Sequence, residues 1–173
     1  MRGARRLLSG TLIVAWAATA AAQTPDLSGT WTLDAGSSRV TSATLGGLIK
    51  AGAPETLHIT HAANGTVVVE SQVNESQSRL YVPNAKTTTP VVPSGSITMT
   101  TRWDGRKLVS EGFQESLGGE PVAVKEVFAV GADTRTLTIE ISTTVGGTTA
   151  ASTLVYVPSS GVQPCQKWPT PCK

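Results

Sequence analysis

The feature that most constrains the fold is a series of short runs in which apolar and polar residues alternate, each followed by a turn signal. In the range 96–103, for example, Ile97 and Met99 fall on one side of an extended chain. This two-residue period is typical of a half-buried β-strand. The pair Asp104-Gly105 then supplies the chemistry of a tight hairpin turn. A chain built from such units is expected to form a β-sheet.

The pattern predicts strands along most of the chain after residue 26. The predicted strands are 27–34, 55–61, 66–73, 77–82, 96–103, 107–115, 121–130, 134–145 and 148–157. Two stretches break the alternation. Residues 35–54 are rich in glycine and hold at most one helical turn at 44–50, and residues 83–93 are rich in Pro and Thr, which predicts an extended loop.

Sequential strands joined by tight turns form an antiparallel meander. A meander this long curls, and closing it removes its exposed edges. We therefore predict an all-β fold, an up-and-down antiparallel meander closing into a barrel of about 8–10 strands. An open sandwich is the alternative, but it needs longer crossover connections than the sequence contains.

The first 22 residues have the pattern of a secretory signal. Three arginines precede an apolar stretch, and Ala20-Ala21-Ala22 offers a small-residue cleavage site before Gln23. The apolar part is shorter than the roughly 20 residues of a membrane-spanning helix. We expect a signal peptide at 1–22, a barrel domain at 23–158 and a tail at 159–173. The protein is then periplasmic or extracellular, without a stable membrane anchor.

Charge argues against a nucleic-acid partner. The chain has 14 Lys+Arg and 12 Asp+Glu, and three of the arginines lie in the predicted signal. The mature chain would carry 11 basic and 12 acidic residues, a formal charge of −1. It has no basic run, so the electrostatic footprint of a nucleic-acid-binding protein is missing from the sequence.

The two cysteines, Cys165 and Cys172, both lie near the C-terminus. Exported proteins meet an oxidising environment, which favours a disulfide between them. Two cysteines without a neighbouring histidine do not complete a zinc site. We predict a short disulfide-closed tail, and we expect no metal and no cofactor.

The opening of the first strand, Gly29-Thr30-Trp31, resembles the Gly-x-Trp opening of the lipocalin-like (calycin) barrels. The likeness is greatest to small exported bacterial proteins of this kind, mostly of unknown role. It implies that Trp31 is a structural plug at the closed end of the barrel and that Gly29 lets the chain approach this floor. In such barrels a basic side chain often covers the tryptophan, and Arg135 is the candidate.

Candidate ligand-binding residues lie on inward-facing positions of the predicted strands. Glu126 shares a face with apolar residues that include Phe128, and a buried carboxylate is costly unless it is paired or protonated. It is therefore a ligand contact, the partner of an inward Arg or hydroxyl, or a sign that the cavity holds water. Alternatively, a local bulge or a place near the barrel mouth exposes it. Met99, Thr101 and His61 are further cavity candidates, with His61 expected at the rim near the Asn64-Gly65 turn.

Three functions remain open from the sequence. The barrel carries a small apolar or amphipathic ligand, or it is a structural or interaction module of the cell envelope. The third function is an enzyme that uses Glu126 or His61, which we favour least because no nucleophile–base pair is evident. The sequence gives no indication of the oligomeric state.

Overall fold

The computed structural model describes residues 24–41, 46–49, 52–73, 75–91, 95–115 and 119–159. The proposed signal peptide, Cys165 and Cys172 lie outside these residues. The described part of the chain forms ten β-strands and one 3₁₀ helix, η1 (Gly47–Ile49). The strands are β1 (Gly29–Leu33), β2 (Thr56–His61), β3 (Val67–Val73), β4 (Glu75–Tyr81), β5 (Lys86–Pro90), β6 (Ser96–Asp104), β7 (Lys107–Glu115), β8 (Val122–Val130), β9 (Leu137–Val145) and β10 (Thr148–Pro158).

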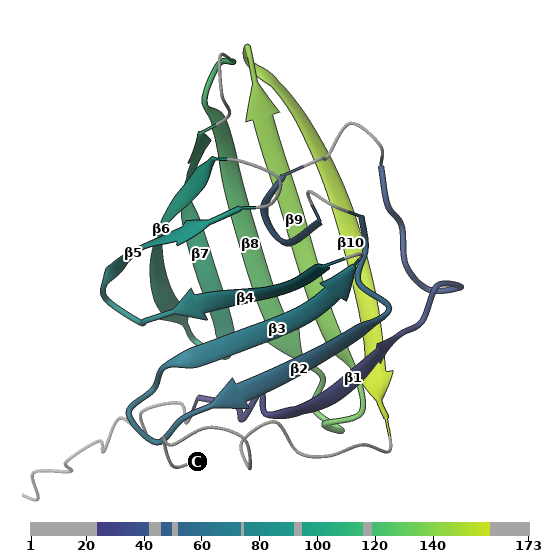
Figure 1. The fold of residues 1–173 in the computed structure, drawn as a ribbon. Coiled ribbons are helices and arrows are strands. Elements are labelled where there is room, and N and C mark those ends of the chain that lie inside the picture. Colours follow the sequence, from purple (N-terminus) through teal and green to yellow (C-terminus); the bar gives the residue numbers. More distant parts are fainter. Residues whose placement is uncertain are drawn as a thin grey trace, which may run out of the picture.

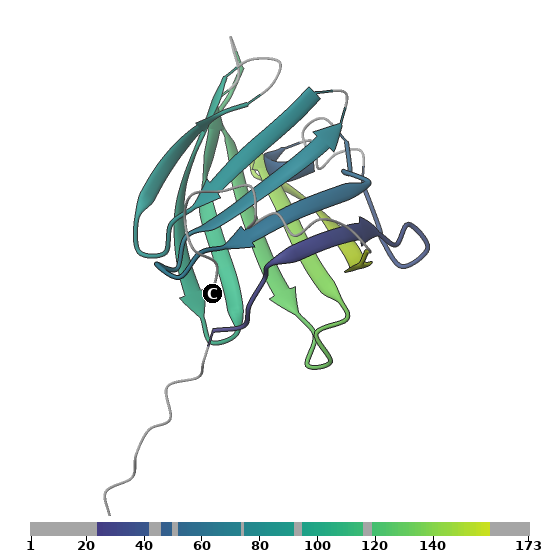
Figure 2. The ribbon, with the colours of Figure 1, turned by 60° about the horizontal axis from the view of Figure 1, so that its bottom comes forward.

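All ten strands belong to one antiparallel sheet with the order β4-β3-β2-β1-β10-β9-β8-β7-β6-β5. The first strand pairs with the second on one side and with the last on the other, so the two ends of the meander, β1 and β10, lie side by side. Figure 2 shows β1 to β4 wrapping across the remaining strands. The all-β meander predicted from the sequence is confirmed, and it is nearly closed into a barrel.

The remaining opening lies between β4 and β5, the two ends of the sheet order. A side-chain hydrogen bond joins β5 to β4 in place of a regular ladder, and the connection between them is bridged to β6. The Thr87 hydroxyl donates to the Leu80 carbonyl at 3.2 Å, and Pro83 forms an isolated bridge with Thr101. The barrel therefore keeps two strand edges next to each other.

The prediction of an irregular link over 83–93 was wrong in its middle. Lys86–Pro90 forms β5 and pairs with β6. The threonines of this stretch favour extended structure, and Pro90 is tolerated because β5 is an edge strand. The turn between β9 and β10 is as predicted: Val145 pairs with Thr148, and the two intervening glycines have φ of 54° and 80°, as a tight hairpin requires.

The barrel interior contains both apolar and polar side chains. One large apolar cluster includes Trp31, Leu57, Phe128 and Tyr156. Buried polar side chains lie along the same inward faces, and they include Ser71, Arg79, Thr101, Ser110, Gln114, Glu126, Thr143 and Ser152. A barrel interior packed only for stability would not need so many polar groups, because each must be hydrogen-bonded to offset its desolvation.

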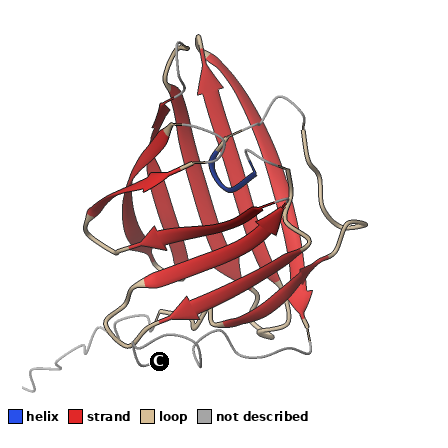
Figure 3. Ribbon diagram, viewed as in Figure 1, coloured by secondary structure: helices blue, strands red, loops and turns tan. Residues whose placement is uncertain are grey.

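The helix η1 lies inside this barrel. It comes from the long connection between β1 and β2, and it is the blue element within the ring of strands in Figure 3. Its three residues, Gly47, Leu48 and Ile49, are all buried, and Leu48 and Ile49 belong to the large apolar cluster. A helical turn thus exists within the range predicted at 44–50, over Gly47–Ile49, and it lies in the core.

Candidate functional site

The site is centred on Glu126, which points into the barrel from β8. Its side chain is fully buried, as strict alternation along this strand predicts. Its cross-strand neighbours are Ser110 on β7 and Ile141 on β9. The prediction that Glu126 faces inward is therefore confirmed.

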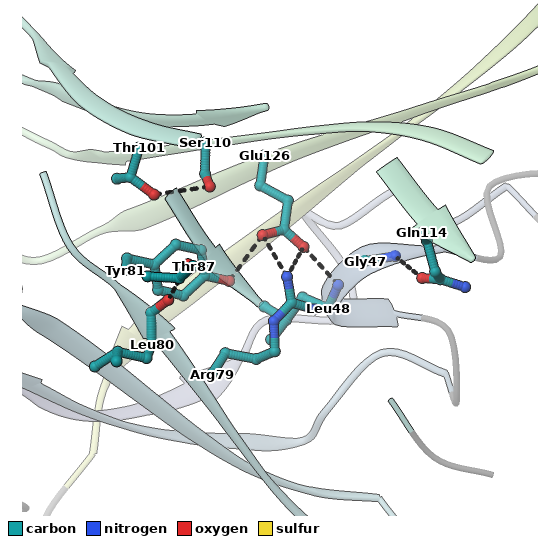
Figure 4. Close-up of polar contacts among 10 residues, drawn as sticks. All are labelled: Gly47, Leu48, Arg79, Leu80, Tyr81, Thr87, Thr101, Ser110, Gln114 and Glu126. Atoms are coloured by element: carbon teal, nitrogen blue, oxygen red, sulfur yellow. Dashed lines mark hydrogen bonds and ion pairs between the residues drawn. The ribbon is translucent and has the colours of Figure 1, made fainter. Parts of the chain in front are cut away.

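Arg79 and Tyr81 reach Glu126 from β4 (Figure 4). The two residues are two positions apart on one strand, so their side chains leave the same face of the sheet. Arg79 Nη2 lies 3.3 Å from Glu126 Oε2 and 3.4 Å from Oε1. The Tyr81 hydroxyl donates to Oε2 at 2.7 Å. Among the alternatives open for Glu126, the structure shows pairing with both an inward Arg and an inward hydroxyl.

The third donor to Glu126 is the backbone of η1. The Leu48 N–H donates to Glu126 Oε1 at 2.6 Å, and the neighbouring Gly47 N–H donates to Gln114 Oε1 at 3.0 Å. These two N–H groups are at the helix start, where they have no intrahelical partner. Side chains of β7 and β8 therefore hold η1 by its unpaired backbone donors.

A glycine pair makes this contact geometrically feasible. A Cβ added at Gly46 would lie 2.7 Å from Thr143 Cγ2, and a Cβ at Gly47 would collide with Glu126 Oε1. Gly47 also has a φ of 57°, a conformation that glycine adopts without steric cost. Larger residues would keep the backbone too far from the barrel wall for its N–H groups to reach the carboxylate.

Burial and the neighbouring groups shift the pKa values of Arg79 and Tyr81. Burial by itself would lower the pKa of the Arg79 guanidinium, but its neighbours, Glu126 first and then Tyr81, outweigh burial and raise that pKa. Burial raises the pKa of the Tyr81 hydroxyl well above its usual range, Arg79 lowers it in part, and Glu126 raises it further. Arg79 therefore stays charged and Tyr81 stays protonated, which keeps both of them donors to the carboxylate.

Two other candidate residues lie close to this cluster. Phe128, two positions along β8, is fully buried and contacts the Tyr81 ring edge-on, with centroids 5.1 Å apart. Thr101 is also fully buried and shares a 2.9 Å hydrogen bond with Ser110, the cross-strand neighbour of Glu126. Met99 is buried in a second, smaller apolar cluster with Val124.

His61 is the last residue of β2 and lies directly before the turn at 62–66, so its predicted place near the Asn64-Gly65 turn agrees with the structure. It is fully buried and stacks on Trp103 with centroids 5.6 Å apart. Its Nδ1 lies 3.7 Å from a carboxylate oxygen of Asp26. Trp103 covers the ring from the end of β6, which alternation along one strand could not reveal. The contacts of His61 are therefore with Trp103 and Asp26, and a ligand contact by His61 stays a prediction.

Gly29 and Trp31 of the Gly-x-Trp opening lie against each other at the start of the first strand. Trp31 is 4% exposed, and its indole N–H donates to the Leu27 carbonyl at 3.1 Å. Gly29 has a φ of 146°, and a Cβ there would lie 3.3 Å from the indole nitrogen. Arg135 is exposed in the turn before β9, where its N–H donates to Asp133. That Trp31 acts as a plug covered by Arg135 stays a prediction.

Sequence reasoning missed four residues of the site: Arg79, Tyr81, Gln114 and Gly47. On β4 the alternation is ambiguous, because Leu80 lies between Arg79 and Tyr81 and would be the natural choice for an inward residue. In the structure Leu80 is 42% exposed and its two neighbours are buried. The one available signal was Glu126 itself, since a buried acid calls for a basic or hydroxyl partner.

Among the described residues there is neither a metal-binding cluster nor a membrane-spanning helix. Within those ranges, no group of three or more His, Cys, Asp or Glu is arranged to hold a metal ion. None of the helices in the same part of the chain is long and apolar enough to cross a membrane.

No protein-family profile matches the sequence, and no curated protein matches it significantly. Solved structures do resemble it. A protein described as the REP1-NXSQ fatty acid transporter superposes with a TM-score of 0.58 at 14% identity, covering 79% of this chain and 98% of that one. The apo form of Caenorhabditis elegans lipid binding protein 8 gives 0.58 at 14% identity, with 76% and 94% covered. A point mutant of the transporter gives 0.54 at 14% identity, with 77% and 98% covered.

The chain has the fold of these β-barrels. Nearly their whole length is matched, so the likeness concerns the complete barrel and not a shared hairpin. This agrees with the lipocalin-like architecture that the Gly-x-Trp opening implies. At 14% identity the likeness establishes the fold alone.

Proposed function

We propose that this protein carries a small apolar or amphipathic ligand inside the barrel. The observation that supports this most is the position of η1. The side chains of the sheet leave enough room in the barrel for residues 46–49, all of which are buried there. A barrel interior that holds a segment of its own chain can hold a ligand of similar size in place of that segment, as ligand-binding barrels do.

The chemistry of the interior supports the same proposal. Leu48 and Ile49 contact an apolar cluster, and Glu126 with Arg79 and Tyr81 supplies a small number of fixed polar groups. An apolar lining with few convergent polar groups is the usual composition of a small-molecule site. Two proteins of similar fold are described as a fatty acid transporter and as a lipid binding protein. We extend ligand binding of this kind to the present chain as part of the proposal.

Native mass spectrometry of protein purified from its own producing cells, together with binding of a polarity-sensitive fluorescent alkyl probe, tests the proposal. We expect a co-purifying small molecule or saturable probe binding with one site per chain. The matched control is Phe113→Ala, because Phe113 lies on the outer face and is 60% exposed. Probe binding that is absent from the wild type, or that Phe113→Ala abolishes, would overturn an interior ligand.

The alternative function, an interaction module, rests on that same outer face. Phe113 borders a surface depression of about 420 Å3, which Ala123, Lys125 and Thr144 also line. Exposed aromatic side chains are enriched where proteins meet partners. The Phe113→Ala control therefore distinguishes the two functions: it would reduce a partner interaction while leaving interior binding of the probe intact.

We also propose that the protein is exported, in line with the small exported bacterial barrels that share the Gly-x-Trp opening. The support is the arginine-rich start and the small-residue site at Ala20-Ala21-Ala22. N-terminal sequencing of the mature protein should begin at or near Gln23. Recovery of intact Met1 from a membrane fraction would contradict export.

A further inference from the structure

We propose that the ligand presents a neutral hydrogen-bond donor, such as a hydroxyl or amide N–H, to Glu126, and not a carboxylate. This inference rests on the proposed carrier function and narrows it to a class of ligand. The donor takes the place of the Leu48 N–H on Glu126 Oε1. The ligand is then a long-chain alcohol or amide, in contrast to the fatty acid named for one protein of similar fold.

The argument starts from the occupancy of the two carboxylate oxygens. Oε2 accepts from the Tyr81 hydroxyl at 2.7 Å and lies 3.3 Å from Arg79 Nη2. Oε1 accepts from the Leu48 N–H at 2.6 Å and lies 3.4 Å from the same guanidinium nitrogen. Arg79 and Tyr81 are fixed on β4, whereas Leu48 belongs to η1, outside the sheet. Oε1 is therefore the position at which a guest can replace a protein donor.

The charge of the cluster decides which head group fits. The Arg79–Glu126 pair is fully buried on the acid side and 5% exposed on the Arg side, so each charge is already neutralised by the other. A ligand carboxylate would add a second buried anion next to Glu126, and like charges at such distances repel strongly in a poorly screened interior. A neutral donor replaces the neutral Leu48 N–H without changing the charge of the cluster.

The apolar part of such a ligand has a lining to contact. Leu48 is 4% exposed and Ile49 is fully buried, and both pack in the cluster that contains Tyr81 and Phe128. A guest that displaces η1 from Glu126 exchanges these two side chains for its own alkyl chain. The exchange keeps apolar surface buried and keeps a donor on Glu126 Oε1, so its free-energy cost is small.

The test is competition between chain-matched ligands at neutral pH. A long-chain alcohol and the fatty acid of equal length would each displace a fluorescent alkyl probe from the full chain. We expect the alcohol to bind about tenfold or more tightly than the acid. The ionised acid has no proton to donate to Glu126 Oε1, and one hydrogen bond to a buried charged group has an effect of this size. Glu126→Gln should reverse this preference, because it leaves the Arg79 charge without an internal partner and gives a ligand carboxylate an amide donor.

A second variant guards against misfolding of Glu126→Gln. Gly47→Ala would place a Cβ against Glu126 Oε1 and separate η1 from the carboxylate. We expect it to tighten alcohol binding, because the ligand no longer competes with the Leu48 N–H. Gly36→Ala is the matched control, since a Cβ there meets only Asp34 Oδ1 at 3.4 Å in an exposed turn. Circular dichroism of each variant checks that the sheet is intact.

The outcomes separate the two proposals. Absence of probe binding to the wild type would defeat the carrier function itself. Binding of the acid as tightly as the alcohol would leave the carrier function standing and overturn the donor-head inference. Unchanged alcohol affinity in a folded Gly47→Ala would also overturn it, because the head group would then not replace the Leu48 N–H.

Discussion

Arg79 Nη2 on β4 lies 3.3 Å from Glu126 Oε2 on β8, and the two strands are not neighbours in the sheet. The pair therefore spans the inside of the barrel. The ring contact between Tyr81 and Phe128 connects the same two strands, so β4 and β8 are joined by an ion pair and by an aromatic contact. The strand at one end of the sheet order is thus fixed to the opposite wall, where no strand-to-strand ladder could fix it.

Breaking this buried pair should strongly destabilise the protein. Arg79→Met leaves Glu126 as a buried charge without its cation, and we expect the free energy of unfolding to fall by about 3 to 5 kcal/mol. The double variant Arg79→Met/Glu126→Leu should cost less than the sum of the single variants, because neither charge is then left alone. Urea unfolding measures the free energy of unfolding of Arg79→Met, Glu126→Leu and the double variant.

The matched control for this cycle is the exposed pair of Arg102 and Glu111. Their side chains are 47% and 39% exposed and lie 3.1 Å apart. We expect Arg102→Met to cost less than about 1 kcal/mol. If Arg79→Met costs no more than this control, the buried pair does not fix β4 to β8.

Trp31→Ala should also destabilise the barrel. The indole is 4% exposed and its N–H is bound to the Leu27 carbonyl, so truncation leaves a cavity and an unpaired carbonyl. Large-to-small core substitutions of this kind cost about 3 to 5 kcal/mol. Phe113→Ala, a change at an exposed aromatic side chain, should stay within about 0.5 kcal/mol. A Trp31→Ala protein of normal stability that has lost only ligand binding would show that Trp31 lines the ligand site.

The tyrosines predict how stability depends on alkaline pH. The chain has two, Tyr81 and Tyr156, and burial raises the pKa of both hydroxyls above the usual value of about 10. Because the folded-state pKa is the higher one, the folded state favours the protonated hydroxyls. Their contribution to the free energy of unfolding is complete below the unfolded-state pKa. It is lost as the pH rises through about 10 toward the folded-state pKa.

Ultraviolet absorbance of tyrosinate, recorded together with circular dichroism, measures this dependence. We expect little ionisation near pH 10 while the sheet is intact, followed by ionisation together with unfolding. Tyr81→Phe should leave a single titrating group. Ionisation of both tyrosines near their usual pKa in a folded protein would contradict the burial of the two hydroxyls.

Gly112 should not tolerate a side chain. It pairs with Met99, and a Cβ at this position would collide with the Thr98 carbonyl oxygen and lie 2.8 Å from Met99 Cα. Both are backbone atoms, so the strands themselves would have to shift. We expect Gly112→Ala to lower the free energy of unfolding by about 1 to 3 kcal/mol, measured by urea unfolding. Gly36→Ala in an exposed turn should change it by less than about 1 kcal/mol.

Most strands were predictable from the sequence because their signals are local. The alternation over 122–130 and the glycine pair Gly146-Gly147 depend only on neighbouring residues, and both predictions hold. The inward position of Glu126 follows from the same alternation. The strand Lys86–Pro90 was missed, because its proline and threonines are also typical of a loop and pairing with β6 is what makes it a strand.

The sequence by itself determined an all-β meander, its tight turns and the burial of one acidic residue, since each depends on the pattern within a single strand. The partners of that residue were decided only by the tertiary structure. Which face of β4 turns inward, and how far Gly46-Gly47 bring η1 into the barrel, depend on how the sheet closes. Closure joins strands far apart in the sequence, and the contacts made across the barrel obey no short-range period.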